Sequence, residues 1–290
     1  MGMFGFLPHA LFTNHMGANT TGLSPRLWRR VTGSLMEPDG SKRLFLVGDD
    51  FAGVHTAGTL TDLISELPYV IYADDTTNHK VRGAADENGG VLQLYIDASA
   101  AANEECGIEL GDAVGQLGQI SDTSGADYVT AFETRVKVSS ITTGQLAMVI
   151  GLASPATAVD GGVIDTNGGP KADKAFIGFS ILADDGDSID FCYQGAGQTR
   201  QDKIAGVAVP VADTFVKLGF LYDPKEEASK RIKVFVNNVE QSTYVTSTEI
   251  AAATFPDAEA LTFACIMKGI AGSVALETAI DWWAFGQVLS

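Results

Sequence analysis

Acidic side chains are the first candidates for chemistry in this sequence. Hydrolysis of a glycosidic bond needs two carboxyl groups roughly 5 to 9.5 Å apart. Glu277 and Asp281 share one face of the strand expected over Ala275–Val288. Four residues at roughly 3.3 Å each put their Cα atoms about 13 Å apart, which is too far for either mechanism. Asp187 and Asp190 are closer but flank an expected turn, so the sequence predicts no catalytic pair and no enzyme.

One acidic run is a candidate for a metal site. The run Asp184-Asp185-Gly186-Asp187 clusters the oxygen ligands that calcium prefers, but it lacks the longer ligand string and the terminal Glu of an EF-hand loop. Asp and Gly are also favoured in tight turns, so we expect a solvated hairpin turn, with bound calcium left open. The four histidines lack metal spacing, and no nucleophile elbow or phosphate loop occurs. No metal and no cofactor are therefore expected.

Charge and hydropathy exclude further classes. The chain has 290 residues, with 36 acidic and 19 basic side chains and a net charge of -17. That charge opposes binding to nucleic acid or to an anionic membrane surface. No stretch approaches 18 apolar residues, and Met1–Phe12 has no basic residue before its apolar run. We expect a soluble protein with no nucleic-acid or membrane partner, made and kept in a cytosolic compartment.

The elements that carry these residues are predicted to be strands. In Tyr128–Val138, apolar residues and Thr alternate with Glu133, Arg135 and Lys137, so one face is expected to be buried and the other to meet water. Lys217 is expected on the outer side of a second such strand. Asn237-Asn238 can adopt the positive φ angles of a two-residue hairpin turn. Further strands are expected at Leu146–Leu152, Lys174–Leu182, Ile189–Tyr193, Phe215–Tyr222, Arg231–Val236, Val239–Val245, Leu261–Met267 and Ala275–Val288.

About a dozen short strands without βαβ spacing predict an all-β fold, a two-sheet antiparallel sandwich. Helical segments are few, and the best is Thr59–Leu67. We place the sandwich at residues 43–290 and an extended N-terminal arm at residues 1–42, with a short helical turn near Pro25–Val31. Of the adjacent Trp282 and Trp283, one is expected to fill the core, because neighbouring residues of a strand point to opposite faces.

The arm carries large apolar groups and the densest basic patch of an acidic chain. The apolar groups cannot cheaply remain in water, so they are expected to pack either on the sandwich or on another subunit. Arginine favours bidentate pairing with carboxylates at interfaces. The residues predicted to bind a partner are Phe4, Phe6, Arg26, Leu27, Trp28, Arg29 and Arg30.

A family resemblance rests on a series of short strings. From about residue 45 to residue 290, the chain resembles the concanavalin A-like, laminin-G-type jelly-roll domain of tailed-phage virion structural proteins. The matching strings are Val47-Gly48-Asp49-Asp50-Phe51, Phe132-Glu133-Thr134-Arg135-Val136-Lys137-Val138, Ile150-Gly151-Leu152-Ala153, Ile177-Gly178-Phe179, Asp213-Thr214-Phe215-Val216-Lys217-Leu218-Gly219, Val234-Phe235-Val236-Asn237-Asn238 and Ile280-Asp281-Trp282-Trp283. They are packing and turn signals, specific for fold more than for function.

The resemblance implies a noncatalytic virion protein of the head-decoration, or cement, type. Its partner would be the major capsid protein, which it would bind on the outer capsid surface after synthesis in the host cytoplasm. It would act as a homo-oligomer, with a trimer favoured. The alternatives are a carbohydrate-binding, lectin-like module of a tail or fibre, and a polysaccharide hydrolase. Exposed aromatic side chains on the concave sheet would favour the lectin, and paired carboxylates there would favour the hydrolase.

Overall fold

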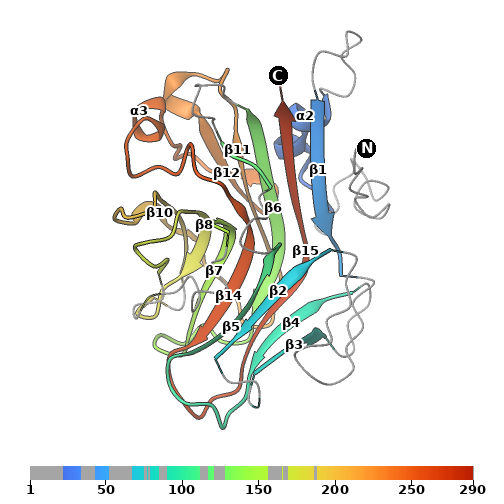
Figure 1. The fold of residues 1–290 in the computed structure, drawn as a ribbon, viewed down its shortest axis with the longest axis vertical. Helices are drawn as coiled ribbons and strands as arrows, with labels where there is room; N and C mark the ends of the chain where they lie inside the picture. Colours follow the sequence, from blue (N-terminus) through green and yellow to red (C-terminus); the bar gives the residue numbers. More distant parts are fainter. Residues whose placement is uncertain are drawn as a thin grey trace.

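The computed structural model describes residues 22–33, 43–51, 67–74, 77, 79–84, 90–111, 117–120, 128–155, 165, 169–185 and 188–289. Within these residues, fifteen strands form two antiparallel sheets that face each other as a sandwich (Figure 1). The all-β, two-sheet prediction is confirmed. The helical elements in this described part of the chain are α2 (Pro25–Gly33), the 3₁₀ turn η2 (Ala228–Lys230) and α3 (Ser247–Ile250).

One sheet has eight strands, in the order β13-β12-β11-β6-β15-β4-β3, with β1 paired to β15. The other has seven, in the order β10-β9-β8-β7-β14-β5-β2. The strand bounds are β1 Arg43–Asp49, β2 Tyr69–Ala73, β3 His79–Gly83, β4 Leu92–Ile96, β5 Glu104–Leu110, β6 Val129–Val138, β7 Leu146–Ala153, β8 Phe176–Ile181, β9 Ile189–Gln194, β10 Gln201–Ala208, β11 Val216–Tyr222, β12 Ile232–Val236, β13 Val239–Glu240, β14 Thr262–Gly269 and β15 Leu276–Leu289.

The core lies between the sheets and follows the predicted alternation. Phe132 of β6 packs on Phe220 of β11, with ring centroids 5.7 Å apart. Trp283 stacks on Phe263 of the opposite sheet at 4.3 Å with nearly parallel rings. Trp283 is fully buried in this core, as predicted for one member of the tryptophan pair. The three cysteines, Cys106, Cys192 and Cys265, are buried and free.

The outer face of β6 corrects one prediction. Glu133 and Lys217, on adjacent strands of the eight-stranded sheet, were expected to meet water, and both are only 1% exposed. The prediction was wrong because α2 and the residues before it cover this part of the face. Figure 1 shows α2 beside the ends of β1 and β15, and its residues contact β6, β11 and β15.

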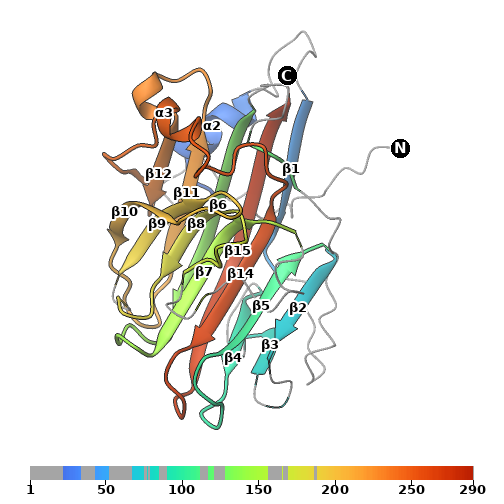
Figure 2. The same ribbon diagram turned by 60° about the vertical axis from the view of Figure 1, so that its left-hand side comes forward.

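The hairpin turn at Asn237-Asn238 is confirmed, with φ angles of 48° and 71°. Its returning strand is shorter than predicted, because only β13 and an isolated bridge between Ile232 and Val245 pair with β12. Figure 2 shows β6 and β15 running side by side through the length of the sandwich. The predicted helix at Thr59–Leu67 lies outside the described residues apart from Leu67. No helix in the described part of the chain is long and apolar enough to cross a membrane.

Candidate functional site

The N-terminal helix brings most of the predicted partner-binding residues together on the sandwich. Pro25 suits the first helical position, where its missing N–H costs nothing, and the Trp28 N–H donates to the Ser24 carbonyl at 3.0 Å. Leu27, Trp28 and Val31 share one side of α2 and are almost fully buried. The three arginines, Arg26, Arg29 and Arg30, lie on the exposed side. In this chain the helix therefore packs on its own sandwich.

Two glycines make room for the helix on the outer face of the eight-stranded sheet. A Cβ atom on Gly219 would lie 2.6 Å from Leu27 Cδ1, and one on Gly286 would lie 2.7 Å from Trp28 Cζ3. Any side chain at these positions would push the helix outward. We call this hollow the helix socket, formed by Ala131, Glu133, Lys217, Gly219, Leu221, Phe235, Ala284, Gly286 and Val288.

A buried carboxylate forms the polar centre of the helix socket. Glu133 accepts hydrogen bonds from the Ser24 N–H at 2.9 Å and from Trp28 Nε1 at 2.8 Å, and the Ser24 hydroxyl donates to it as well. Burial raises the pKa of Glu133, an effect that the charge of Lys217 opposes. Lys217 Nζ donates to the Gly22 carbonyl at 2.5 Å, and burial lowers its pKa. The start of α2 is thus held by buried, partnered polar groups.

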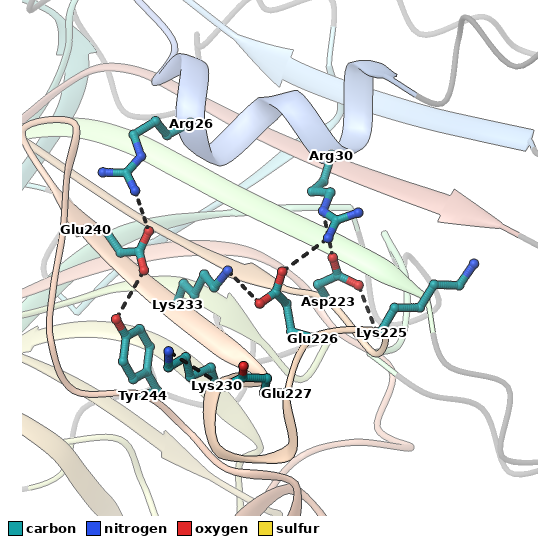
Figure 3. Close-up of polar contacts among 10 residues, drawn as sticks. All are labelled: Arg26, Arg30, Asp223, Lys225, Glu226, Glu227, Lys230, Lys233, Glu240 and Tyr244. Atoms are coloured by element: carbon teal, nitrogen blue, oxygen red, sulfur yellow. Dashed lines mark hydrogen bonds and ion pairs between the residues drawn. The ribbon is translucent and has the colours of Figure 1, made fainter.

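Ion pairs close the rim of the helix socket, as Figure 3 shows. Arg26 pairs with Glu240 of β13 at 3.2 Å. Arg30 reaches Asp223 at 3.0 Å and Glu226 at 3.1 Å. Hydrogen bonds from Lys233 and Arg30 lower the pKa of Glu226. Arg29 is also exposed, and no hydrogen bond or ion pair joins it to another described residue.

The sequence did not single out a second buried carboxylate site on the seven-stranded sheet. Glu105 and Glu109 share the outer face of β5, and both are under 5% exposed. Lys268, opposite on β14, donates to Glu105 at 3.1 Å and to the Asp165 carbonyl at 3.0 Å. Burial raises the pKa of Glu105 to about 7 despite this lysine. The strict alternation of Cys106 and Ile108 with Glu105, Gly107 and Glu109 was the signal in the sequence that could have indicated this strand.

This carboxylate pair lacks the access that hydrolysis requires. A saccharide must reach both groups, whereas Glu109 is 1% exposed and Glu105 is in contact with a lysine. Two of the four carboxylates considered from sequence are also engaged elsewhere. Asp281 pairs with Arg135, at a register shift of β15, and Asp190 pairs with Arg200 at 3.0 Å.

The turn that begins at Asp184 is partly described. The Asp185 N–H donates to the Leu182 carbonyl at 3.2 Å, as in a tight turn. Gly186 and Asp187 lie outside the described residues, as do Phe4 and Phe6 of the arm. Among the described residues, no three His, Cys, Asp or Glu side chains gather closely enough to hold a metal ion.

Sequence reasoning identified the helix residues but not the helix socket that receives them. Glu133, Gly219 and Gly286 lie in three different strands, and no local pattern joins them. The available signals were Ser24-Pro25, which is typical of a helix start, and a glycine inside each of two apolar strands, which often marks a close approach of another segment. Whether α2 and the preceding arm bind a partner stays a prediction.

Comparison with known proteins supports the fold. No family model and no curated protein matches the sequence. A protein of unknown function from Shewanella oneidensis MR-1 is similar at a TM-score of 0.51 and 15% identity, covering 92% of this chain and 95% of that one. Peanut lectin is similar at 0.52 and 14%, covering 86% and 99%. Basic winged bean lectin is similar at 0.51 and 10%, covering 84% and 98%. The chain thus has the concanavalin A-like jelly-roll fold of these lectins.

Proposed function

We propose that the protein is a noncatalytic virion structural protein of the capsid-decoration type. It binds the outside of a shell of major capsid protein after synthesis in the host cytoplasm, and it stabilises that shell as a symmetric oligomer, with a trimer favoured. The observation that carries the proposal is the anchored arm, since α2 fixes residue 22 to the outer sheet at Lys217. The 21 residues before it begin from a fixed point and include Phe4 and Phe6.

The contacts of α2 refine which arm residues serve the partner. Leu27 and Trp28 are buried against their own sandwich, and Arg26 and Arg30 are engaged in ion pairs. Phe4, Phe6 and the exposed Arg29 are then the residues assigned to the shell. Each single contact of this kind is weak, but many copies bound to one shell add their contacts through multivalency.

The lectin alternative has the support of a shared fold, which by itself does not assign function. Sugar-binding faces usually offer exposed aromatic rings. Among the described residues, the large apolar side chains that are mostly exposed are three valines, Val209, Val211 and Val239. The hydrolase alternative would need Glu105 and Glu109, which are buried and lie four residues apart on β5, a spacing that puts their Cα atoms about 13 Å apart. Both alternatives therefore rank below the decoration role.

Co-sedimentation with undecorated capsids from the same source, followed by electron microscopy of the pellet, tests the proposal. The full chain should bind saturably at a fixed copy number per capsid subunit. Deletion of residues 2–21, which keeps α2 and its contacts, should abolish binding, and Phe4→Ala with Phe6→Ala should weaken it. Val239→Ala serves as the matched surface control.

Two outcomes would count against the proposal. Full occupancy by the deletion variant would remove the arm from the mechanism. Absence of binding by the full chain would reject the decoration role and direct the work to glycan arrays and to hydrolase assays that include Glu105→Gln.

A further inference from the structure

The helix and the helix socket form a binding unit that is separate from the main core. The apolar cluster around Leu27, Trp28 and Val31 shares no residue with the cluster between the sheets. No sheet ladder continues into α2, and the polar contacts described above involve side chains. The sandwich core is therefore complete without α2, and the helix can leave without breaking a strand.

The helix α2 needs the helix socket in order to stay helical, whereas the helix socket could equally hold the helix of another copy. Nine residues are too few for a stable isolated helix in water, so α2 is helical only when docked. Its covalent link to β1 is the nine-residue segment 34–42, which spans at most about 30 Å. A helix from another molecule would make the same contacts with the helix socket, with no loss of buried area or hydrogen bonds.

The contacts also define the ligand narrowly. A fitting helix needs a hydrogen-bond donor that reaches Glu133, an apolar face that fits over Gly219 and Gly286, and cations that meet Glu240, Asp223 and Glu226. A cationic ligand suits this acidic rim. The segment Ser24–Val31 of this chain meets all these requirements, so the ligand is one that every copy carries.

We propose that the helix socket also binds α2 of a second copy of this chain, so that neighbouring copies exchange helices. The balance between the two states depends on concentration, because a short linker gives the attached helix an effective concentration in the millimolar range. Exchange is thus favoured where copies are crowded. The inference rests on the proposed function for that crowding, whereas its test requires no shell.

Two full-length variants test the exchange. Leu27→Ala with Trp28→Ala makes an acceptor whose own helix cannot dock and whose helix socket stays open. Gly286→Leu makes a donor with an intact helix and a filled helix socket. The atoms nearest to a Cβ at this position all belong to side chains and not to backbone. Each variant alone should have the mass of a single copy of this chain, or of the wild-type oligomer. Mixing them should double that mass in size-exclusion chromatography with light scattering.

Controls separate exchange from other contacts. Circular dichroism must show both variants folded, and Ala284→Leu replaces Gly286→Leu as the donor if the latter is not. Adding Glu133→Leu to the acceptor should abolish the mass change. Folded variants that keep their separate masses on mixing would overturn the inference, as would doubling of the acceptor mass without donor. A negative result on shells would reject the decoration role and leave this measurement unaffected.

Discussion

Two glutamates, one on the outer face of each sheet, are buried to a similar degree but differ in their partners. Glu133 of the eight-stranded sheet accepts hydrogen bonds from Ser24 and Trp28, which a separate helix supplies. Glu105 of the seven-stranded sheet contacts Lys268 of the neighbouring strand, and its Oε2 has no hydrogen-bond partner among the described residues. The first carboxylate joins two parts of the chain, and the second lies within one sheet.

Loss of a partner should therefore have a different effect on each glutamate. Removing a partner of Glu133 frees a helix, which can expose the carboxylate to water and so limit the cost. Removing the partner of Glu105 leaves a charge inside a sheet that cannot open locally, and an unpaired buried charge is expensive. We therefore expect local effects at the helix socket and global effects at Glu105.

Lys268→Met should have the largest effect. It leaves Glu105 without its cation, and loss of one member of a buried pair costs about 3 to 5 kcal/mol of the free energy of unfolding. The cost should be greatest at pH 8, where the carboxylate is ionised, and smaller at pH 5, where it can take up a proton. Urea unfolding at the two pH values measures both. Equal losses at pH 5 and pH 8 would contradict the assignment of the charge to Glu105.

Trp28→Ala should have the next largest effect, but on docking rather than on the whole fold. Truncation of a buried Trp costs about 3 to 5 kcal/mol, and here it also removes a donor to Glu133. Trypsin should then cleave rapidly at Arg26, Arg29 and Arg30, while the urea midpoint of the sandwich changes little. If the midpoint falls as steeply as in Lys268→Met, the helix and the core form one cooperative unit.

The pH dependence of stability should separate the two glutamates further. The pKa of Glu105 is about 7 in the folded state, above its ordinary value of 4.5. Because the unfolded state releases this proton first, stability is fully present below about pH 4.5 and falls as the pH rises toward 7. The loss is about 2 to 3 kcal/mol between pH 5 and pH 8.

Glu105→Gln should remove this slope from urea unfolding, because an amide does not ionise. Glu133→Gln should change the pH dependence of trypsin cleavage of α2 instead, since the pKa of Glu133 is raised in the same direction. A Glu105→Gln curve that is parallel to that of the wild type would show that other groups cause the slope.

The helix arginines should give the smallest effects, in a defined order. Arg30→Ala should weaken the docking of α2 by about 1 kcal/mol, because it removes a cation from Asp223, which is 2% exposed. Arg26→Ala should weaken the docking of α2 by less, since the Arg26 side chain is 70% exposed. Arg29→Ala should leave trypsin cleavage at the other arginines unchanged. If the effects do not fall in the order Arg30, Arg26, Arg29, the ion pairs described here do not determine how firmly α2 is docked.

The sequence predicted nine of the fifteen strands, because their signals are local, and it did not predict β1 to β5 or β10. Alternation in Val129–Val138 reports that one face is buried, and Asn237-Asn238 reports a turn through its positive φ angles. It placed Glu133 in water because alternation cannot indicate a second layer. That layer comes from α2, more than 100 residues away in the chain.

Of the candidate site, the residues of α2 could be predicted from the sequence and the helix socket could not. The apolar and basic residues of α2 stand out in a glycine-rich arm, so the sequence predicted that this segment packs either on the sandwich or on another subunit. The helix socket needs glycines and a glutamate from separate strands to meet, and only the folded register of β6, β11 and β15 brings them together. Glu105 and Glu109 were missed because nothing local in the sequence indicates that the outer face of β5 is buried.

The pairing of β1 with β15 has a mechanical consequence. Arg43 at the start of β1 lies opposite Leu289 at the end of β15, so tension between the two ends of the chain loads their hydrogen bonds one at a time, as in unzipping. Leu44 and Leu46 of β1 and Val288 of β15 all pack in the cluster with α2. A pull from the N-terminus must therefore peel the helix away before the first strand can open, which makes α2 a force-sensitive latch.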